Sequence, residues 1–248
     1  LNELEKKFAK FPSGRRKIIT SLINENRNLA AAYKLILKWH TNDVTPLNWE
    51  VNRLSRALTT QGRWKLAHRL FMNTRSLAEK SESGYVYNGS FNLPTTNNSF
   101  DWYIRKQSGV EISYVLHTEL NNQPEITRNY VKMRFLGNPL QLRNVNQTVP
   151  TPPGDYKFQV TYATSDLKTP KPIRITLDCV GQKNQLVSLQ LKQGTVGPLT
   201  KELIFTVPDK NCNFSKVEMN NEFVALTWRN RFDGEVRLYD VRIVRVAE

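Results

Sequence analysis

The fold of this chain is decided by residues 232–243, FDGEVRLYDVRI. Asp233-Gly234 is typical of a tight hairpin turn, because glycine adopts the left-handed backbone that such turns need. The residues that follow are rich in valine, leucine, tyrosine and isoleucine, which predicts a closing β-strand. A counterpart, NGSF, stands at residues 88–91, just after helical periodicity ends. We expect the region between these two stretches to form strands.

Short β-branched and aromatic runs fill that region, separated by clusters of Asn, Gly and Pro, as in an antiparallel sandwich. We expect strands at residues 100–106, 110–118, 127–136, 155–163, 172–179, 186–191, 201–207, 214–219, 222–230 and 235–246. Trp102 and Trp228 could each pack in the core or contact a ligand. The inward phase of Trp102 favours the core. Alternation along three strands places further side chains in the core: Val131, Met133 and Phe135; Tyr156, Phe158, Val160 and Tyr162; Ile173, Ile175, Leu177 and Cys179.

The opening NGSF and the closing Gly-x-apolar-x-apolar-x-Asp-Val-x-apolar resemble the two ends of a carbohydrate-binding-module-like jelly roll, in the galactose-binding-like group. The resemblance covers about residues 84–248. It implies glycan binding in the cell envelope, either periplasmic or extracellular. There Cys179 and Cys212 would form a disulfide, whereas in the cytosol they would stay buried thiols. Related modules often hold a structural calcium, for which Asp240 matches the closing acid, although Asn92 replaces the usual opening acid.

Residues 1–83 show helical periodicity instead, with helices expected over about 15–40, 47–60 and 63–79 and a break near 24–28. A plain helical hairpin is one interpretation of this segment. The other is a resemblance to one tetratricopeptide repeat, in which small residues let two helices approach closely; it rests on Val51, Leu54, Ser55, Leu58, Gly62, Ala67 and Phe71. We therefore expect an α+β multidomain chain, with a tetratricopeptide-like α-helical unit at 1–83 and an antiparallel jelly-roll β-sandwich at 84–248.

The net charge of +14 is unevenly distributed. Residues 1–83 hold 16 Lys/Arg and 7 Asp/Glu, and residues 84–248 hold 20 and 15. A basic helical part suggests an anionic partner, such as nucleic acid, lipid headgroups or an acidic glycan, or a solvated surface with no partner. No run approaches the roughly 18 apolar residues of a membrane helix, so we expect no transmembrane segment.

The sequence has no Gly-x-Ser-x-Gly elbow, phosphate-binding glycine loop, His-Glu-x-x-His motif or dinucleotide fingerprint. Glycoside cleavage needs two carboxylates about 5–10 Å apart, and nothing in the sequence selects a pair. We therefore expect a protein that is not an enzyme.

Sugar recognition uses an aromatic ring stacked on a pyranose, together with amide and charged groups. The basic bias favours an acidic polysaccharide, because arginine can hold a carboxylate through two hydrogen bonds. Residues with an outward phase would line one sheet face if their strands were neighbours: Tyr103, Arg105, Lys132, Arg134, Lys157, Gln159, Arg174, Asp178 and Arg229.

Three alternatives remain open for these surfaces. The outward face can be ordinary solvated sheet. It can also pack against a protein partner, in a structural or assembly protein whose helices mediate assembly. Nucleic acid is the third partner class, through the basic Arg15-Arg16-Lys17 and the helical tryptophans Trp39, Trp49 and Trp64.

Overall fold

The computed structural model describes residues 11–24, 28–41, 44–116, 128–182, 184–222, 225 and 227–246. The chain forms two compact units. The helical unit comprises Leu1–Ser81 and Thr96–Phe100, and the sandwich unit comprises Glu82–Thr95 and Asp101–Glu248. In the part of the chain that is described, no helix is long and apolar enough to cross a bilayer.

The described helices of the helical unit are α2 (Pro12–Asn24), α3 (Leu29–Thr41), α4 (Asn48–Thr60), α5 (Trp64–Asn73) and α6 (Leu77–Ser81). α2 ends and α3 begins on either side of the predicted break. Gly62 has a φ of +72° in the turn between α4 and α5, which favours glycine. Ala67 and Phe71 are fully buried. The tetratricopeptide resemblance stays a prediction, because any close helical hairpin buries such residues.

A buried ion pair joins α2 to α4. The Arg15 Nε donates to Glu50 Oε1 at 2.8 Å, and both side chains are buried. Glu50 also accepts from the backbone N–H of Leu47 at 2.9 Å, which caps the start of α4. The Arg15 guanidinium lies 4.8 Å from the centroid of the buried Trp39 ring. Arg15 and Trp39 are therefore core residues and not part of a nucleic-acid surface.

The segment Thr96–Phe100 also belongs to the helical unit. The Asn98 amide donates to Asn52 Oδ1 at 2.7 Å. The Phe100 ring packs edge-on against His68, with centroids 5.2 Å apart. The prediction of a strand over residues 100–106 is therefore wrong in its first part, and only Tyr103–Ile104 forms a strand there.

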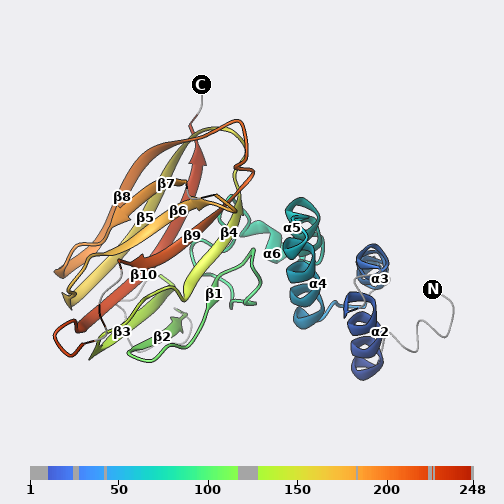
Figure 1. Cartoon of the computed structure of the whole chain (residues 1–248), viewed down its shortest axis with the longest axis horizontal. Helices are drawn as coiled ribbons and strands as arrows, with labels where there is room; N and C mark the ends of the chain where they lie inside the picture. Colours follow the sequence, from blue (N-terminus) through green and yellow to red (C-terminus); the bar gives the residue numbers. More distant parts are fainter. Residues whose placement is uncertain are drawn as a thin grey trace. The chain divides into compact units, whose positions relative to one another are not determined.

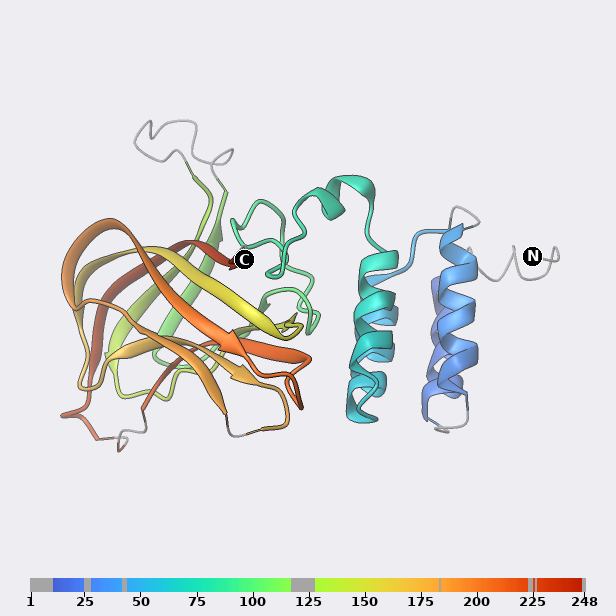
Figure 2. The same ribbon diagram turned by 90° about the horizontal axis from the view of Figure 1, so that it is seen from above.

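The sandwich unit consists of two five-stranded antiparallel sheets (Figures 1 and 2). The first, called here the β9 sheet, has the order β1-β4-β9-β6-β7. The second, the β10 sheet, has the order β2-β3-β10-β5-β8. The bounds are β1 Tyr103–Ile104, β2 Val110–Val115, β3 Tyr130–Asn138, β4 Val145–Pro150, β5 Gly154–Lys168, β6 Ile173–Cys179, β7 Gln185–Gln190, β8 Gly194–Val207, β9 Phe214–Asn221 and β10 Phe232–Arg245.

The core between the sheets confirms the predicted alternation. Every side chain predicted to face inward on β3, β5 and β6 is buried, and so is Trp102. Two further differences from the predicted strands are found in this unit. β4 was not predicted, and the predicted strand at 222–230 contains a turn in which Trp228 is 68% exposed.

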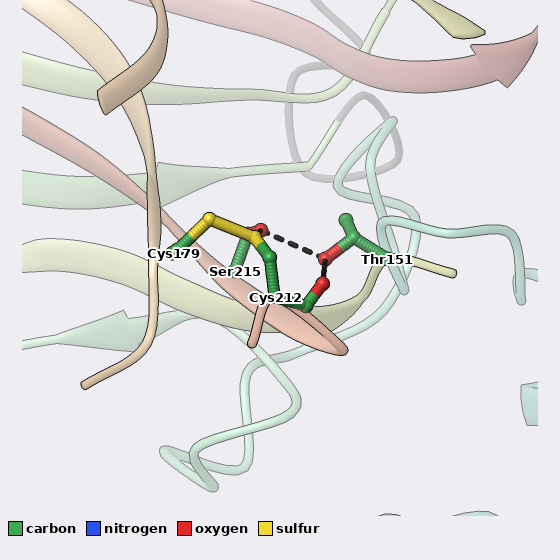
Figure 3. Close-up of a disulfide and its surroundings, with 4 residues drawn as sticks. All are labelled: Thr151, Cys179, Cys212 and Ser215. Atoms are coloured by element: carbon green, nitrogen blue, oxygen red, sulfur yellow. Dashed lines mark hydrogen bonds between the residues drawn. A yellow bond between two sulfur atoms is a disulfide. The ribbon is translucent and has the colours of Figure 1, made fainter. Parts of the chain in front are cut away.

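A disulfide joins Cys179, at the end of β6, to Cys212, just before β9, with Cα atoms 5.2 Å apart (Figure 3). Both cysteines are buried. Beside them, the hydroxyls of Thr151 and Ser215 share a 2.7 Å hydrogen bond. The bridge closes a loop of 33 residues that contains β7 of the β9 sheet and β8 of the β10 sheet.

The NGSF stretch, residues 88–91, packs against β10. Asn88 has a φ of +51° and is buried, and its amide donates to Leu93 O at 2.7 Å. The backbone N–H of Val241 donates to Gly89 O at 3.0 Å. A Cβ on Gly89 would collide with the Val241 carbonyl, so glycine is required at this close approach.

Candidate functional site

A bulge in β10 shapes the outer face of the β10 sheet. The register of β10 against β5 shifts between Leu238 and Asp240. Val236 and Leu238 point into the core before the bulge, and Val241 and Ile243 do so after it. Two consecutive residues, Tyr239 and Asp240, therefore both face outward, as extra residues at bulges often do near binding sites.

These two side chains line a cleft of about 640 Å³, called here the Tyr239 cleft. Its described lining is polar apart from one aromatic ring. The lining residues are Ser90, Asn92, Arg128, Asn129, Gln159, Thr161, Thr200, Tyr239, Asp240 and Arg242. The volume lies within the usual range of small-ligand sites, roughly 300–1,000 Å³.

A network of hydrogen bonds holds one side of the cleft. The Ser90 hydroxyl donates to Asp240 Oδ1 at 2.7 Å. The Arg242 Nε donates to Asp240 Oδ2 at 2.8 Å, and its terminal nitrogen donates to the Ser90 hydroxyl at 3.2 Å. The carboxylate is therefore oriented by two donors while the exposed guanidinium keeps further donors for a ligand.

Fixed polar groups make up the other walls. The Asn129 amide donates to Asn92 Oδ1 at 2.9 Å, and Asn92 in turn donates to Glu82 at 3.0 Å. The hydroxyls of Thr161 and Thr200 lie 2.9 Å apart. The ring of the buried Tyr130 packs against that of Tyr239, with centroids 5.4 Å apart.

Charges on the rest of this outer face are largely neutralised. Lys132 pairs with Glu235 at 2.9 Å, and Lys157 pairs with Glu202 at 3.3 Å. Burial raises the pKa of Glu235, but hydrogen bonds from Lys132 and Arg237 outweigh it, so the pKa lies below its ordinary value. The expected basic face is thus a face of ion pairs.

Arg128 is the exception within the cleft. Its side chain is exposed, and among the described residues no acid lies within ion-pair distance of it. The lining holds a single carboxylate, Asp240, which is paired with Arg242. An exposed guanidinium beside oriented polar groups is suited to holding a ligand.

A calcium at Asp240 does not fit these surroundings. Calcium requires about six to eight oxygen ligands, and the described residues contain no cluster of three or more acidic, His or Cys side chains. The Arg242 guanidinium already lies against both carboxylate oxygens. Asp240 is an ion-pair partner in this structure, and no metal role is proposed for it.

The residues predicted to bind ligand do not share one face. Tyr103 and Arg174 belong to the β9 sheet, while Lys132, Arg134, Lys157 and Gln159 belong to the β10 sheet. Arg105 and Arg229 lie in connections outside the strands. Their strands are not all neighbours, so the condition for a single binding face is not met. Asp178 also lies on the β9 sheet, and of the nine residues only Gln159 lines the Tyr239 cleft.

Solved structures similar to this chain include carbohydrate-binding modules. A family 61 module in complex with β-1,4-galactotriose is 16% identical, with a TM-score of 0.43 over 66% of this chain and 99% of that chain. A family 4 module is 15% identical, with a TM-score of 0.45 over 65% and 99%. A family 22 xylan-binding domain from Paenibacillus barcinonensis is 11% identical, with a TM-score of 0.41 over 64% and 93%.

No protein-family model and no curated protein sequence matches the chain. With identities of 11–16% and TM-scores below 0.5, the structural matches do not assign a ligand. What the Tyr239 cleft can bind depends on this chain's own residues.

Tyr239 was not among the residues predicted to bind ligand, although the sequence contains a signal for it. The apolar positions Val236 and Leu238 have one phase, and Val241 and Ile243 have the other. A change of phase inside one strand indicates a bulge. It marks Tyr239 and Asp240 as the two residues that share an outward face.

Proposed function

We propose that the sandwich unit binds a glycan in the Tyr239 cleft without transforming it. The observation that carries the proposal is the β10 bulge, which sets the Tyr239 ring beside the Asp240 carboxylate and the Arg242 guanidinium. An aromatic face beside oriented donors and acceptors is what a pyranose needs, since it has both an apolar face and hydroxyls. The resemblance of the chain's NGSF and GEVRLYDVRI stretches to carbohydrate-binding modules supports the same function.

The ligand that fits best carries carboxylates. Arg128 and Arg242 contribute two positive charges to the cleft, and Asp240 contributes one negative charge. Arginine can hold a carboxylate through two parallel hydrogen bonds. We propose an acidic polysaccharide for this reason. The lysines on the surrounding face are paired with acids, so the preference for an anionic ligand depends on Arg128.

A protein partner on the helices is a second proposal, and a specific groove favours it. A cavity of about 770 Å³ between α2 and α4 is lined by the half-buried Trp49 and three arginines, Arg16, Arg53 and Arg56. Such a mixture of ring and guanidinium groups is typical of protein interfaces. Nucleic acid is the alternative occupant of the same groove, through its three arginines.

We further propose a location in the cell envelope, outside the cytoplasm. The buried Cys179–Cys212 disulfide supports this, because oxidising compartments preserve such bridges. A count of free thiols in protein taken from its native compartment tests it. Blocked thiols support export, and two free thiols contradict it.

A glycan array probed with the full chain tests the binding proposal. We expect saturable signals on uronate-containing glycans that weaken in Arg128→Ala. The proposal fails if no glycan gives a saturable signal while a pull-down recovers a stable protein complex. A measured turnover of any glycan would overturn its non-catalytic part.

A further inference from the structure

The five connections at one end of the sandwich unit form a single patch. Strand registers bring them together, because Phe232 pairs with Asn138, Asp233 with Lys168, and Gly194 with Leu167. The connections are residues 105–109, 139–144, 169–172, 191–193 and 222–231. This patch is called here the basic end.

The basic end holds the positive excess of residues 84–248. Arg105 and Lys106 lie in the first connection, Arg143, Lys171 and Lys192 lie one in each of the next three, and Arg229 and Arg231 lie in the last. All seven are exposed. The only acid in these connections is Glu222, so the net charge there is +6.

The opposite end of the sandwich has no such excess. Its four connections are residues 116–129, 151–153, 180–184 and 208–213. Their sequences hold three basic residues, Arg128, Lys183 and Lys210, against three acidic residues, Glu119, Glu125 and Asp209. The asymmetry is therefore between two ends of one unit and not a general basic composition.

These cations are not used up by internal ion pairs. In the described part of the chain, Lys171 is the one member of the seven that lies within ion-pair distance of an acid, at 3.7 Å from Glu222. Arg229 and Arg231 instead flank the Trp228 ring, with guanidinium carbons 5.5 and 5.9 Å from its centroid. The patch is thus available to an external anion.

Trp228 is displayed on a turn that hydrogen bonds hold in place. The Asn230 N–H donates to Thr227 O at 3.0 Å, and its side chain donates to Ala225 O at 2.7 Å. The Arg231 Nε donates to Trp228 O at 2.9 Å. The Trp228 ring is 68% exposed and lies between two arginines. It is therefore suited to a surface that offers apolar groups next to negative charges.

We propose that the basic end docks on an anionic lipid surface, with Trp228 at the level of the headgroups. The seven cations come from five separate connections and so form a broad end instead of a track along one strand, which matches a surface better than a single linear polymer. Tryptophan is favoured at membrane interfaces, and clustered Lys/Arg are attracted to anionic leaflets.

Sedimentation with vesicles tests the proposal on the full chain. We expect binding to phosphatidylcholine vesicles containing phosphatidylglycerol, weakening as salt rises, and little binding to phosphatidylcholine alone. Arg229→Ala/Arg231→Ala should bind at least about tenfold more weakly. A matched control, Lys210→Ala/Arg245→Ala, removes two exposed charges from the opposite end and should stay within about twofold of the wild type.

Two comparisons separate a lipid surface from other anions. Trp228→Ala should weaken vesicle binding several-fold but leave binding to a soluble polyuronate or to DNA unchanged. Equal losses in both double-charge variants, or vesicle binding that is indifferent to Trp228, would overturn the proposal. Tyr239→Ala should leave vesicle binding intact, so failure of the glycan proposal and failure of this one give different results.

Discussion

The Ser90 hydroxyl donates a 2.7 Å hydrogen bond to the carboxylate of Asp240, which lies 150 residues later in the chain. This bond joins the opening NGSF stretch to the closing strand at the wall of the Tyr239 cleft. The two stretches that define the ends of the sandwich therefore also build its candidate binding site. Arg242 completes the group by contacting both residues.

Ser90→Ala should weaken glycan binding by roughly fivefold, because the loss of one hydrogen bond worth about 1 kcal/mol releases Asp240 and Arg242. Isothermal titration with the tightest glycan from the array measures this. Ser90→Thr keeps the hydroxyl and serves as the control. Equal affinities for the wild type and Ser90→Ala would remove this network from the site.

Glu50→Gln should destabilise the helical unit by about 3–5 kcal/mol, because Arg15 would keep a buried charge without its partner. Thermal unfolding followed by helical circular dichroism measures this loss. The double variant Arg15→Met/Glu50→Leu removes both charges and should recover most of the stability. If the double variant is as unstable as the single one, packing and not the ion pair is responsible.

Cys179→Ala/Cys212→Ala should lower the stability of the sandwich unit by about 3–4 kcal/mol, since a loop of 33 residues loses its closure. Thermal unfolding followed at a β-sheet signal, with and without reductant, measures the change. Reductant should lower the Tm of the wild type and leave that of the variant unaltered. A wild type insensitive to thorough reduction would contradict this contribution.

Stability of the helical unit should fall as the pH drops below 6.5. Burial lowers the pKa of His68 from its ordinary value of 6.5, so the unfolded chain takes up a proton before the folded chain does. The contribution of the neutral His68 to the free energy of unfolding is complete above pH 6.5. It is lost below that pH as protons bind to the unfolded state. Helical melting at pH 7.5 and pH 5 should differ less in His68→Asn than in the wild type.

The fold of the sandwich could be predicted because its strands alternate clearly. On β5 and β6 every residue predicted from phase to face inward is buried, and the core residue Leu167 was missed because β5 continues beyond the predicted strand. β4 was missed because a buried polar residue interrupts it. Gln147 is fully buried, and its amide donates to Tyr87 O at 2.8 Å, a partner that no local pattern reveals.

The candidate site was predicted less well, for two physical reasons. Outward phase shows that Tyr103 and Arg174 leave the core, but it does not show that their sheet differs from that of Lys132. The acids that neutralise the lysines of this face are also distant from them in sequence: Glu202 pairs with Lys157, and Glu235 pairs with Lys132. Counting the charges of single strands therefore overstated the positive charge of the face. The bulge at Tyr239 was visible in the sequence as a change of phase.

Titration calorimetry of Tyr239→Ala and Tyr103→Ala with the same glycan tests the central claim most directly. The two tyrosines lie on different sheets, and only Tyr239 lines the cleft. We predict that Tyr239→Ala weakens binding by about tenfold or more, because the stacking ring is lost, while Tyr103→Ala stays within about twofold of the wild type. Binding that survives Tyr239→Ala and is lost in Tyr103→Ala would contradict the account and place the ligand on the β9 sheet.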